Sequence, residues 1–134
     1  MVTADYSDLI EHARAAMSRA YAPYSNFPVG AAILTDTGNI YSGCNVENAA
    51  YPLGNCAEAS AISSMIMGGD NSIAAIAVAG FGDELCTPCG GCRQRIREFA
   101  DEATPVLIGD NNTIRYTSTL GDLLPLSFGP DNLN

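Results

Sequence analysis

The sequence predicts an α/β fold in which helices cover the faces of a mixed sheet. Segments with helical periodicity alternate with short apolar runs of strand length along the chain. The run at residues 73–79 is apolar throughout, which is typical of a strand covered on both faces. The length of 134 residues suits one domain, so we expect a single domain over residues 1–134.

The expected elements follow in the order helix, two strands, helix, strand, helix, two strands, helix. Ser7 is a candidate N-cap for the first helix, whose apolar spacing ends before Pro23. The second helix is expected to begin at Asn55 or Cys56 and to stop at Gly68-Gly69, a common C-terminal signal. The other expected elements are strands at 29–34, 40–46, 73–79, 104–108 and 113–117 and helices at 89–100 and 120–124.

The charge of the chain argues against two classes of partner. It has 15 acidic residues and 6 basic ones, all of them Arg, and a formal net charge of −9. Binding to a nucleic-acid backbone or to an anionic membrane surface needs clustered basic residues. We therefore expect no nucleic-acid or membrane partner, and a partner that is neutral or cationic.

The five cysteines are expected to be reduced. Their odd number prevents complete pairing within the chain, and residues 1–6 lack the features of a secretory signal. No apolar stretch reaches the ~20 residues that span a bilayer. These observations predict a cytoplasmic protein, in which clustered cysteines are more often metal ligands or catalytic groups than disulfides. Because the chain has one His, a transition-metal site must depend on thiolates.

Two expected helix starts carry cysteines that favour a metal site. Cys56 lies at one, and the segment 86–92 supplies the Cys-x-x-Cys spacing of a zinc half-site at the other. Both Cys86/Cys89 and Cys89/Cys92 have this spacing, and helical geometry favours the second pair. A helix N-terminus stabilises thiolates, and zinc binds thiolates without redox chemistry, so zinc is the expected ion.

Glu58 distinguishes two interpretations of such a site. Three ligands leave zinc an open position for an acidic water, and Glu58 could take a proton from that water and pass it to a substrate. In the alternative, Cys44 or Cys86 is the fourth ligand of a closed structural site, and Glu58 is only an acidic residue at a helix start. The spacing alone leaves both possibilities open.

Four motifs in order carry a family resemblance. Cys56-Ala57-Glu58 followed by Pro88-Cys89-Gly90-Gly91-Cys92 matches the zinc deaminase signature. Residues 21–32, 43–51 and 92–94, with Leu123-Leu124-Pro125 and Phe128 near the C-terminus, complete the set. Nearly the whole chain resembles the cytidine deaminases of the small, homotetrameric, zinc-dependent type.

The resemblance implies a three-layer α/β/α fold around a central mixed five-stranded sheet. It implies one zinc ion per subunit, held by Cys56, Cys89 and Cys92, with Glu58 as the catalytic proton shuttle. Cytidine and deoxycytidine would be deaminated at C4 to uridine and deoxyuridine, with release of ammonia, in pyrimidine salvage. The absence of Lys and of an Arg cluster also favours an uncharged nucleoside over a nucleotide.

The resemblance also implies the substrate contacts. Asn45 and Glu47 match residues that hold the ribose hydroxyls, and Val46 between them belongs to the same set. Phe27 matches an aromatic residue that lies against the base, and the backbone of Ala57 would recognise the base edge. A final contact, Phe128, matches an aromatic residue that is contributed to a neighbouring subunit's site.

One position departs from the family pattern. Relatives with a cysteine-only site usually carry Arg directly after Cys-Ala-Glu, where this chain has Ala59. The resemblance implies that this Arg offsets the negative charge of a zinc ion with three thiolates, which is −1. Our hypothesis is that Arg93, on the same helix face as Cys89 and Cys92, compensates this charge together with the two helix ends.

Two other functions remain as alternatives. A deaminase of a modified cytosine nucleoside, such as a blasticidin S deaminase, keeps the cysteine motifs but matches less well around residues 45–48, which are intact here. A non-catalytic binding domain stabilised by zinc belongs to a different class, and it would need no role for Glu58.

Overall fold

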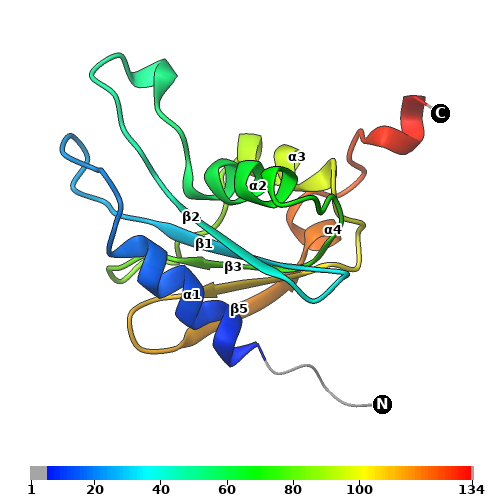
Figure 1. Ribbon diagram of the computed structural model, residues 1–134, viewed down its shortest axis with the longest axis horizontal. Helices are drawn as coiled ribbons and strands as arrows, with labels where there is room; N and C mark the ends of the chain where they lie inside the picture. The colour runs from blue at the N-terminus through cyan, green and yellow to red at the C-terminus, as the bar shows by residue number, and fades with distance from the viewer. Residues whose placement is uncertain (1–5, 134) are drawn as a thin grey trace.

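A five-stranded mixed sheet lies between two helical layers in the computed structural model, which describes residues 6–133 (Figure 1). The helices and strands are α1 (Ser7–Met17), β1 (Gly30–Thr35), β2 (Ile40–Cys44), α2 (Ala57–Met67), β3 (Ile73–Ala79), α3 (Gly90–Arg97), β4 (Pro105–Gly109), β5 (Ile114–Thr119) and α4 (Leu120–Leu123), with 3₁₀ turns η1 (Tyr51–Leu53) and η2 (Pro130–Leu133). The strand order is β2-β1-β3-β4-β5, in which β3 and β4 are parallel and the other neighbours are antiparallel. The expected fold class is confirmed.

Helix α1 covers one face of the sheet through a layer of small side chains. Its buried residues pack against alanines of β1 and β3, including Ala32 and Ala77. At Gly30, an added Cβ would overlap backbone atoms of Ala13 and Met17 in α1. Glycine at this position therefore lets the helix lie directly on the start of β1.

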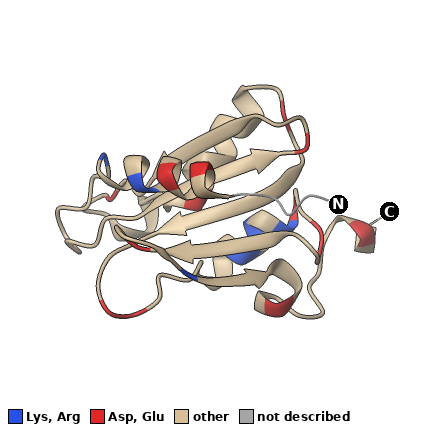
Figure 2. Cartoon of the chain, turned by 90° about the horizontal axis from the view of Figure 1, so that it is seen from below, with Lys and Arg blue, Asp and Glu red and all other residues tan. Residues whose placement is uncertain are grey.

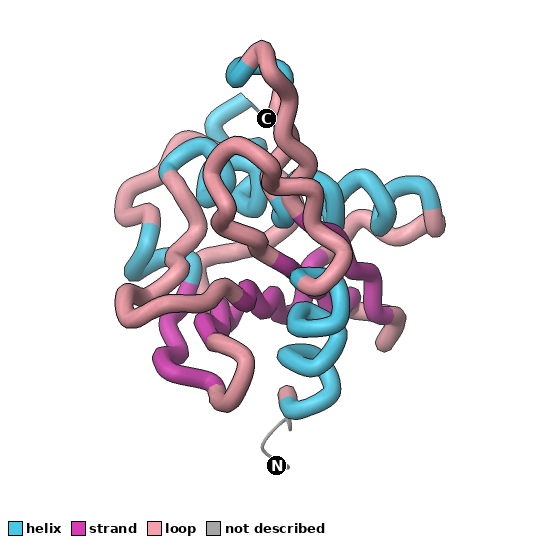
Figure 3. Tube along the Cα trace, turned by 90° about the vertical axis from the view of Figure 1, so that its left-hand side faces the viewer, coloured by secondary structure: helices cyan, strands magenta, loops and turns pink. Residues whose placement is uncertain are grey.

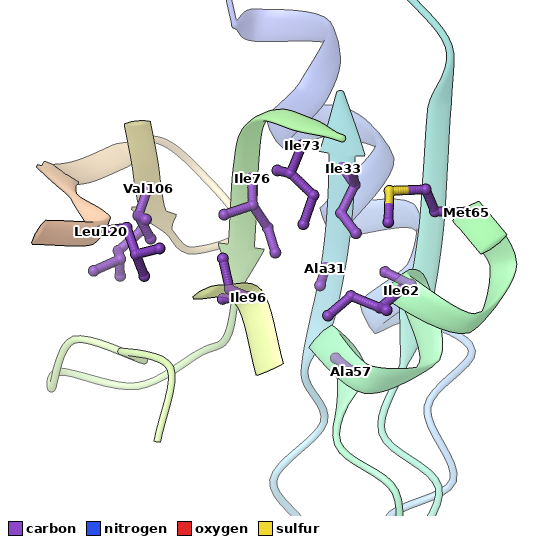
Figure 4. Close-up of a cluster of buried hydrophobic side chains, with 12 residues drawn as sticks. Ala31, Ile33, Ala57, Ile62, Met65, Ile73, Ile76, Ile96, Val106 and Leu120 are labelled. Atoms are coloured by element: carbon purple, nitrogen blue, oxygen red, sulfur yellow. The ribbon is translucent and has the colours of Figure 1, made fainter. Parts of the chain in front are cut away.

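Helices α2, α3 and α4 cover the opposite face. Figure 4 shows Ile33 and Ile76 on this face of the sheet, with Ile62 and Met65 of α2 and Ile96 of α3 beside them. In β1, Ile33 faces this layer whereas Ala32 faces α1, as the two-residue period of a strand requires. The central strands are thus buried on both sides, as their apolar sequences predict.

The first helix differs from its expected form in two ways. Its N-cap is Tyr6, and Ser7 is the first helical residue, so the prediction that Ser7 is the N-cap was wrong. The helix ends at Met17, well before Pro23, because Tyr21 pairs with Val46 as an isolated β-bridge. This tertiary pairing needs extended backbone, which periodicity in the helix sequence cannot reveal.

The loops that precede β1 and follow β2 lie side by side at one end of the molecule. The bridge between Tyr21 and Val46 joins them, with the Tyr21 N–H donating to Asn45 O and the Glu47 N–H donating to Tyr21 O. Figure 3 views the molecule from this end, where loops dominate. The site residues expected in residues 21–32 and 43–51 are therefore neighbours in space.

Acidic residues are spread over several elements, whereas basic residues occupy few positions (Figure 2). Within residues 6–133, no helix is both long and apolar enough to cross a membrane. Residues 1–5, which carry most of the segment tested for a secretory signal, lie outside the described residues.

Candidate functional site

Two helix starts bring the cysteines together. Cys56 is the N-cap of α2 and Cys89 is the N-cap of α3, as the sequence predicted. Their carbonyls accept the first helical hydrogen bonds, from the Ser60 N–H at 3.1 Å and the Arg93 N–H at 2.9 Å. Cys92 follows in the first turn of α3 and is fully buried. The positive ends of both helices therefore point at one place, which stabilises anionic ligands there.

Cys56, Glu58 and Cys92 form a compact group of metal-ligating side chains, called here the cysteine cluster. Their donor atoms all lie within 4.8 Å of one another. The structure joins the Sγ atoms of Cys56 and Cys92 as a disulfide, which differs from the expectation that all five cysteines are reduced. The Cα atoms of Cys56 and Cys92 are 7.6 Å apart, which is wider than a disulfide spans without backbone movement. Thiolates with a carboxyl beside them are groups found at zinc sites, so the cysteine cluster is consistent with a zinc site.

The other three cysteines differ in their surroundings. Cys89 is exposed, and its Sγ is not among the donor atoms of the cysteine cluster. Cys44 and Cys86 are half-buried. Burial, and to a lesser extent the charge of Glu58, raises the pKa of the Cys86 thiol to about 11. The Sγ of Cys86, like that of Cys89, is not among the donor atoms of the cysteine cluster.

Glu58 has the properties of a group that exchanges protons. It is 5% exposed, at the second residue of α2. Burial raises its pKa, and a hydrogen bond from its own backbone N–H and the charge of Arg95 partly offset this rise. The carboxyl therefore holds its proton at a higher pH than an ordinary Glu does, which favours general acid–base catalysis near neutral pH.

The cation beside the sulfur atoms is Arg95, and not Arg93. Nη1 of Arg95 lies 3.9 Å from Sγ of Cys56 and 3.8 Å from Sγ of Cys92. Arg93 instead donates to the carbonyls of Pro88 and Leu123, each at 2.7 Å. This geometry differs from our hypothesis, which placed Arg93 at the thiolates. The spacing places Arg93 on the helix face of Cys89 and Cys92, but the long Arg95 side chain reaches back along the helix to Cys92.

Phe27 lies beside a second aromatic residue that the sequence analysis missed. The rings of Phe27 and Phe81 are stacked, with centroids 5.7 Å apart and planes inclined by 26°. Both side chains are exposed, as expected of an aromatic surface that can receive a flat ligand. The available signal for Phe81 was an aromatic residue two positions after the end of β3, a strand in which all residues but Ala74 are buried.

Asn45 fixes the loop that carries Phe27. Its Oδ1 accepts from the Val29 N–H at 2.9 Å, and its Nδ2 donates to the Phe27 carbonyl at 3.0 Å. The side chain is therefore already engaged with the protein at two of its hydrogen-bonding sites. This loop-bracing role was not anticipated, and it places Phe27 relative to the end of β2.

Glu47 is held at the wall of a cavity of about 360 Å³. It accepts hydrogen bonds from the N–H groups of Tyr24 and Ser25, at 2.9 and 3.1 Å, and from the Ser25 hydroxyl. These donors, the Ser25 hydroxyl foremost, lower the pKa of Glu47. Glu47 is thus an oriented anion. The cavity is lined by Tyr24, Ser25, Glu47, Asn48, Tyr51 and Gly54, of which only Glu47 was expected as a site residue.

The remaining expected contacts are placed separately. Ala57 is fully buried at the start of α2, next to Cys56 and Glu58. Val46 is partly exposed within the bridge that joins the two loops. Phe128 is exposed on the C-terminal segment, which lies at the end of the molecule opposite the loop of residues 45–56 (Figure 1). Phe128 does not line the cavity beside Glu47; its carbonyl instead accepts a hydrogen bond from Gln94 Nε2 of α3, at 2.8 Å.

Comparison with known proteins gives consistent matches. The family described as "Cytidine and deoxycytidylate deaminase zinc-binding region" matches residues 3–108. The chain is 41% identical over 130 residues to a cytidine deaminase of Sporosarcina psychrophila, covering 97% of this chain and 96% of that protein. It is 42% identical over 134 residues to the cytidine deaminase of Mycobacterium tuberculosis, covering 99% and 96%. Its fold matches the crystal structure of cytidine deaminase from Burkholderia pseudomallei with a TM-score of 0.87 and 44% identity, covering 93% of this chain and 100% of that chain.

Proposed function

This chain belongs to the cytidine and deoxycytidylate deaminase family, and from that premise we propose how its residues perform the reaction. The protein is a cytidine deaminase, a zinc-binding hydrolase that converts cytidine to uridine and releases ammonia. The observation that carries the proposed mechanism is the cysteine cluster, in which a buried carboxyl adjoins two sulfur atoms at two helix starts.

Cys56, Cys89 and Cys92 are the proposed zinc ligands. Cys56 and Cys92 already meet in the structure, and Cys89 is three residues from Cys92 at the N-cap of α3. With three protein ligands, zinc would supply the open position and the lowered water pKa that hydrolysis requires. The helix ends stabilise the thiolate forms of these side chains.

Glu58 moves the protons in the proposed mechanism. Its carboxylate takes a proton from the attacking water and transfers it to N3 of the pyrimidine as C4 gains the water oxygen. A second proton then passes through the same carboxyl to the amino group, which leaves as ammonia while the C4–N bond breaks. The raised pKa of Glu58 suits a group that must accept and donate a proton in each turnover.

The loop residues are the proposed nucleoside contacts. Glu47, anionic and held by Ser25, would accept hydrogen bonds from the sugar hydroxyls, and Asn45 and Val46 would complete that side of the site. Phe27 would lie against the base, and the buried backbone of Ala57 would hydrogen-bond its edge. Because Glu47 is anionic and no Lys is available, the site is expected to prefer cytidine and deoxycytidine over their phosphates.

A homotetramer is the proposed assembly. Large apolar side chains are exposed on the loop of residues 51–53 and on the C-terminal segment, where Leu126 is fully exposed. Because Phe128 is not among the residues that line the cavity beside Glu47 in its own chain, it would complete the site of a neighbouring subunit. Sedimentation analysis should give four chains, and removal of Phe128 by Phe128→Ala should raise KM for cytidine without loss of zinc.

Thiolate ligands need a reducing compartment, so the cytoplasm and the salvage of pyrimidine nucleosides are the proposed setting.

A substrate panel with one variant tests the function. Ultraviolet absorbance should report deamination of cytidine and deoxycytidine, and slower or no change with cytidine monophosphate, adenosine and blasticidin S. Glu58→Gln should lower kcat by at least about 10³-fold while zinc content stays at one per subunit, because only the proton transfers are lost. Glu98→Gln, which alters an exposed carboxyl at the end of α3, is the matched control and should keep full activity.

Two results would contradict the proposal. Faster turnover of cytidine monophosphate than of cytidine would refute the nucleoside preference. An active Glu58→Gln enzyme would remove Glu58 from the mechanism.

A further inference from the structure

The proposed zinc site carries an excess of negative charge. Three thiolates give a divalent ion a net charge of −1, and an ionised Glu58 adds another. The partial charges of two helix ends offset part of this excess. Ala59, on the first turn of α2 after Cys56, provides no charge. A cation close to the sulfur atoms would therefore stabilise the metal-bound state.

Arg95 is placed to be this cation. Its Nη1 is within hydrogen-bond distance of both cluster sulfurs, at 3.9 Å from Cys56 and 3.8 Å from Cys92. The same nitrogen lies 3.6 Å from the position that a Cβ of Gly91 would occupy, so the side chain folds back over the first turn of α3. One guanidinium thus joins sulfur atoms that belong to two different helices.

The other arginines with contacts in the described part of the chain are engaged elsewhere. Arg93 donates to two backbone carbonyls, and Arg97 donates to the Ser127 hydroxyl and pairs with Asp131. Arg14 and Arg115 both lie near Asp110, away from the cluster. Within residues 6–133, Arg95 is the arginine whose described hydrogen bonds go to sulfur.

We propose that Arg95 is a positioning residue that stabilises the zinc-bound thiolates of Cys56 and Cys92 through charge-assisted N–H···S hydrogen bonds. The inference rests on the proposed zinc site and adds to it a residue on α3 that takes the place of a cation on α2. Its physical basis is that binding zinc converts neutral thiols into a net anionic site, so a fixed positive charge favours the bound state. Mutation of a residue that hydrogen-bonds to a metal ligand commonly lowers metal affinity by about 10–100-fold.

Competition with a chelator of known affinity, at one fixed pH, tests the role. Arg95→Gln should weaken zinc binding by about tenfold, at the lower end of that range because the side chain is exposed. Arg95→Lys should keep most of the affinity, because it keeps the charge. Arg19→Gln is the matched control, since it removes an equal charge from an exposed residue outside the site, and it should not change zinc affinity.

Cobalt substitution gives a second readout that does not depend on activity. Without the guanidinium, the thiolates donate more electron density, so the sulfur-to-cobalt charge-transfer band of Arg95→Gln should move to lower energy. A residue with only a structural role would leave this band unchanged.

The outcomes separate this inference from the proposed site. If wild-type protein binds one zinc and Cys56→Ala binds none, the site stands. If Arg95→Gln then matches Arg19→Gln in zinc affinity and cobalt spectrum, the role of Arg95 is refuted while the site remains. If the wild-type protein binds no zinc, the proposed site itself fails.

Discussion

Cys56 and Cys92 meet across two helices, with their Sγ atoms in contact and their Cα atoms 7.6 Å apart. They are 36 residues apart in the sequence, and the packing of α2 and α3 on the same face of the sheet brings them together. The backbone separation is too wide for a relaxed disulfide, whereas two ligands of a shared ion need no short Cα distance. The pair is consistent with the zinc site that we propose at these two helix starts.

Thiol counting distinguishes these two states. Protein purified without reductant in the absence of oxygen, then unfolded with a chelator, should give five reactive thiols, because zinc release frees all its ligands. A disulfide between Cys56 and Cys92 would leave three. The Cys56→Ala variant is the control and should give four thiols and no zinc.

Arg93→Ala should lower stability more than it lowers zinc affinity. The substitution leaves the carbonyls of Pro88 and Leu123 without their charged donor, which costs about 1–3 kcal/mol when such groups are half-buried. Urea unfolding and chelator competition measure the two quantities separately. A large loss of zinc affinity at unchanged stability would restore Arg93 as the compensating charge.

Gly30→Ala should destabilise the fold by about 3 kcal/mol or more. The new Cβ would overlap backbone atoms of α1, which cannot move aside as a flexible side chain can. Gly90→Ala is the control for the free energy of unfolding, because a Cβ there meets no atom within 4 Å. Equal stabilities of the two variants would show that α1 can shift away from β1 at little cost.

Asp70→Asn should lower stability at neutral pH and lose this effect in acid. Hydrogen bonds from Asn39, Thr37 and nearby hydroxyls, Asn39 foremost, lower the pKa of Asp70. A carboxyl with a lowered pKa in the folded state adds stability above its unfolded pKa, near 3.9, and that stability is lost as the pH falls through the folded value. Denaturant unfolding at pH 7 and in steps below pH 4 should follow this course.

The control for Asp70 is Asp36→Asn, an exposed carboxyl in the turn of residues 35–39, which supplies hydrogen bonds to Asp70. It should change stability little at any pH. If both variants lose the same free energy of unfolding at pH 7, the hydrogen bonds to Asp70 do not stabilise the fold.

Cys86 should resist alkylation at pH 8. With a pKa of about 11, ~0.1% of this thiol is ionised, compared with roughly a quarter of an ordinary thiol, and the thiolate is the reactive form. Mass spectrometry of a Cys44→Ser variant treated with iodoacetamide should show modification of Cys86 at least about 100-fold slower than that of an unstructured peptide thiol. A comparable rate would mean that Cys86 is solvated and ionises normally.

The sequence by itself determined the order of the elements and the chemical identity of the site. The full apolar run at residues 73–79 became β3 with the predicted ends, and both cysteine helix starts were located. These features depend on hydrophobic periodicity and helix-capping preferences, which are determined by residues close together in the sequence. The nature of the ligands followed as well, since thiolates beside a carboxyl favour zinc chemistry wherever the chain brings them together.

Only the tertiary structure decided which side chains meet. In the structure, Arg95 is the cation beside the sulfur atoms, and Phe27 stacks on Phe81. The first helix is followed by a β-bridge between Tyr21 and Val46. Each of these depends on side-chain rotamers or on contacts between distant segments, for which residue spacing carries no signal. The local sequence determines which side chains each helix or strand carries, and packing against the shared sheet determines which other residues those side chains contact.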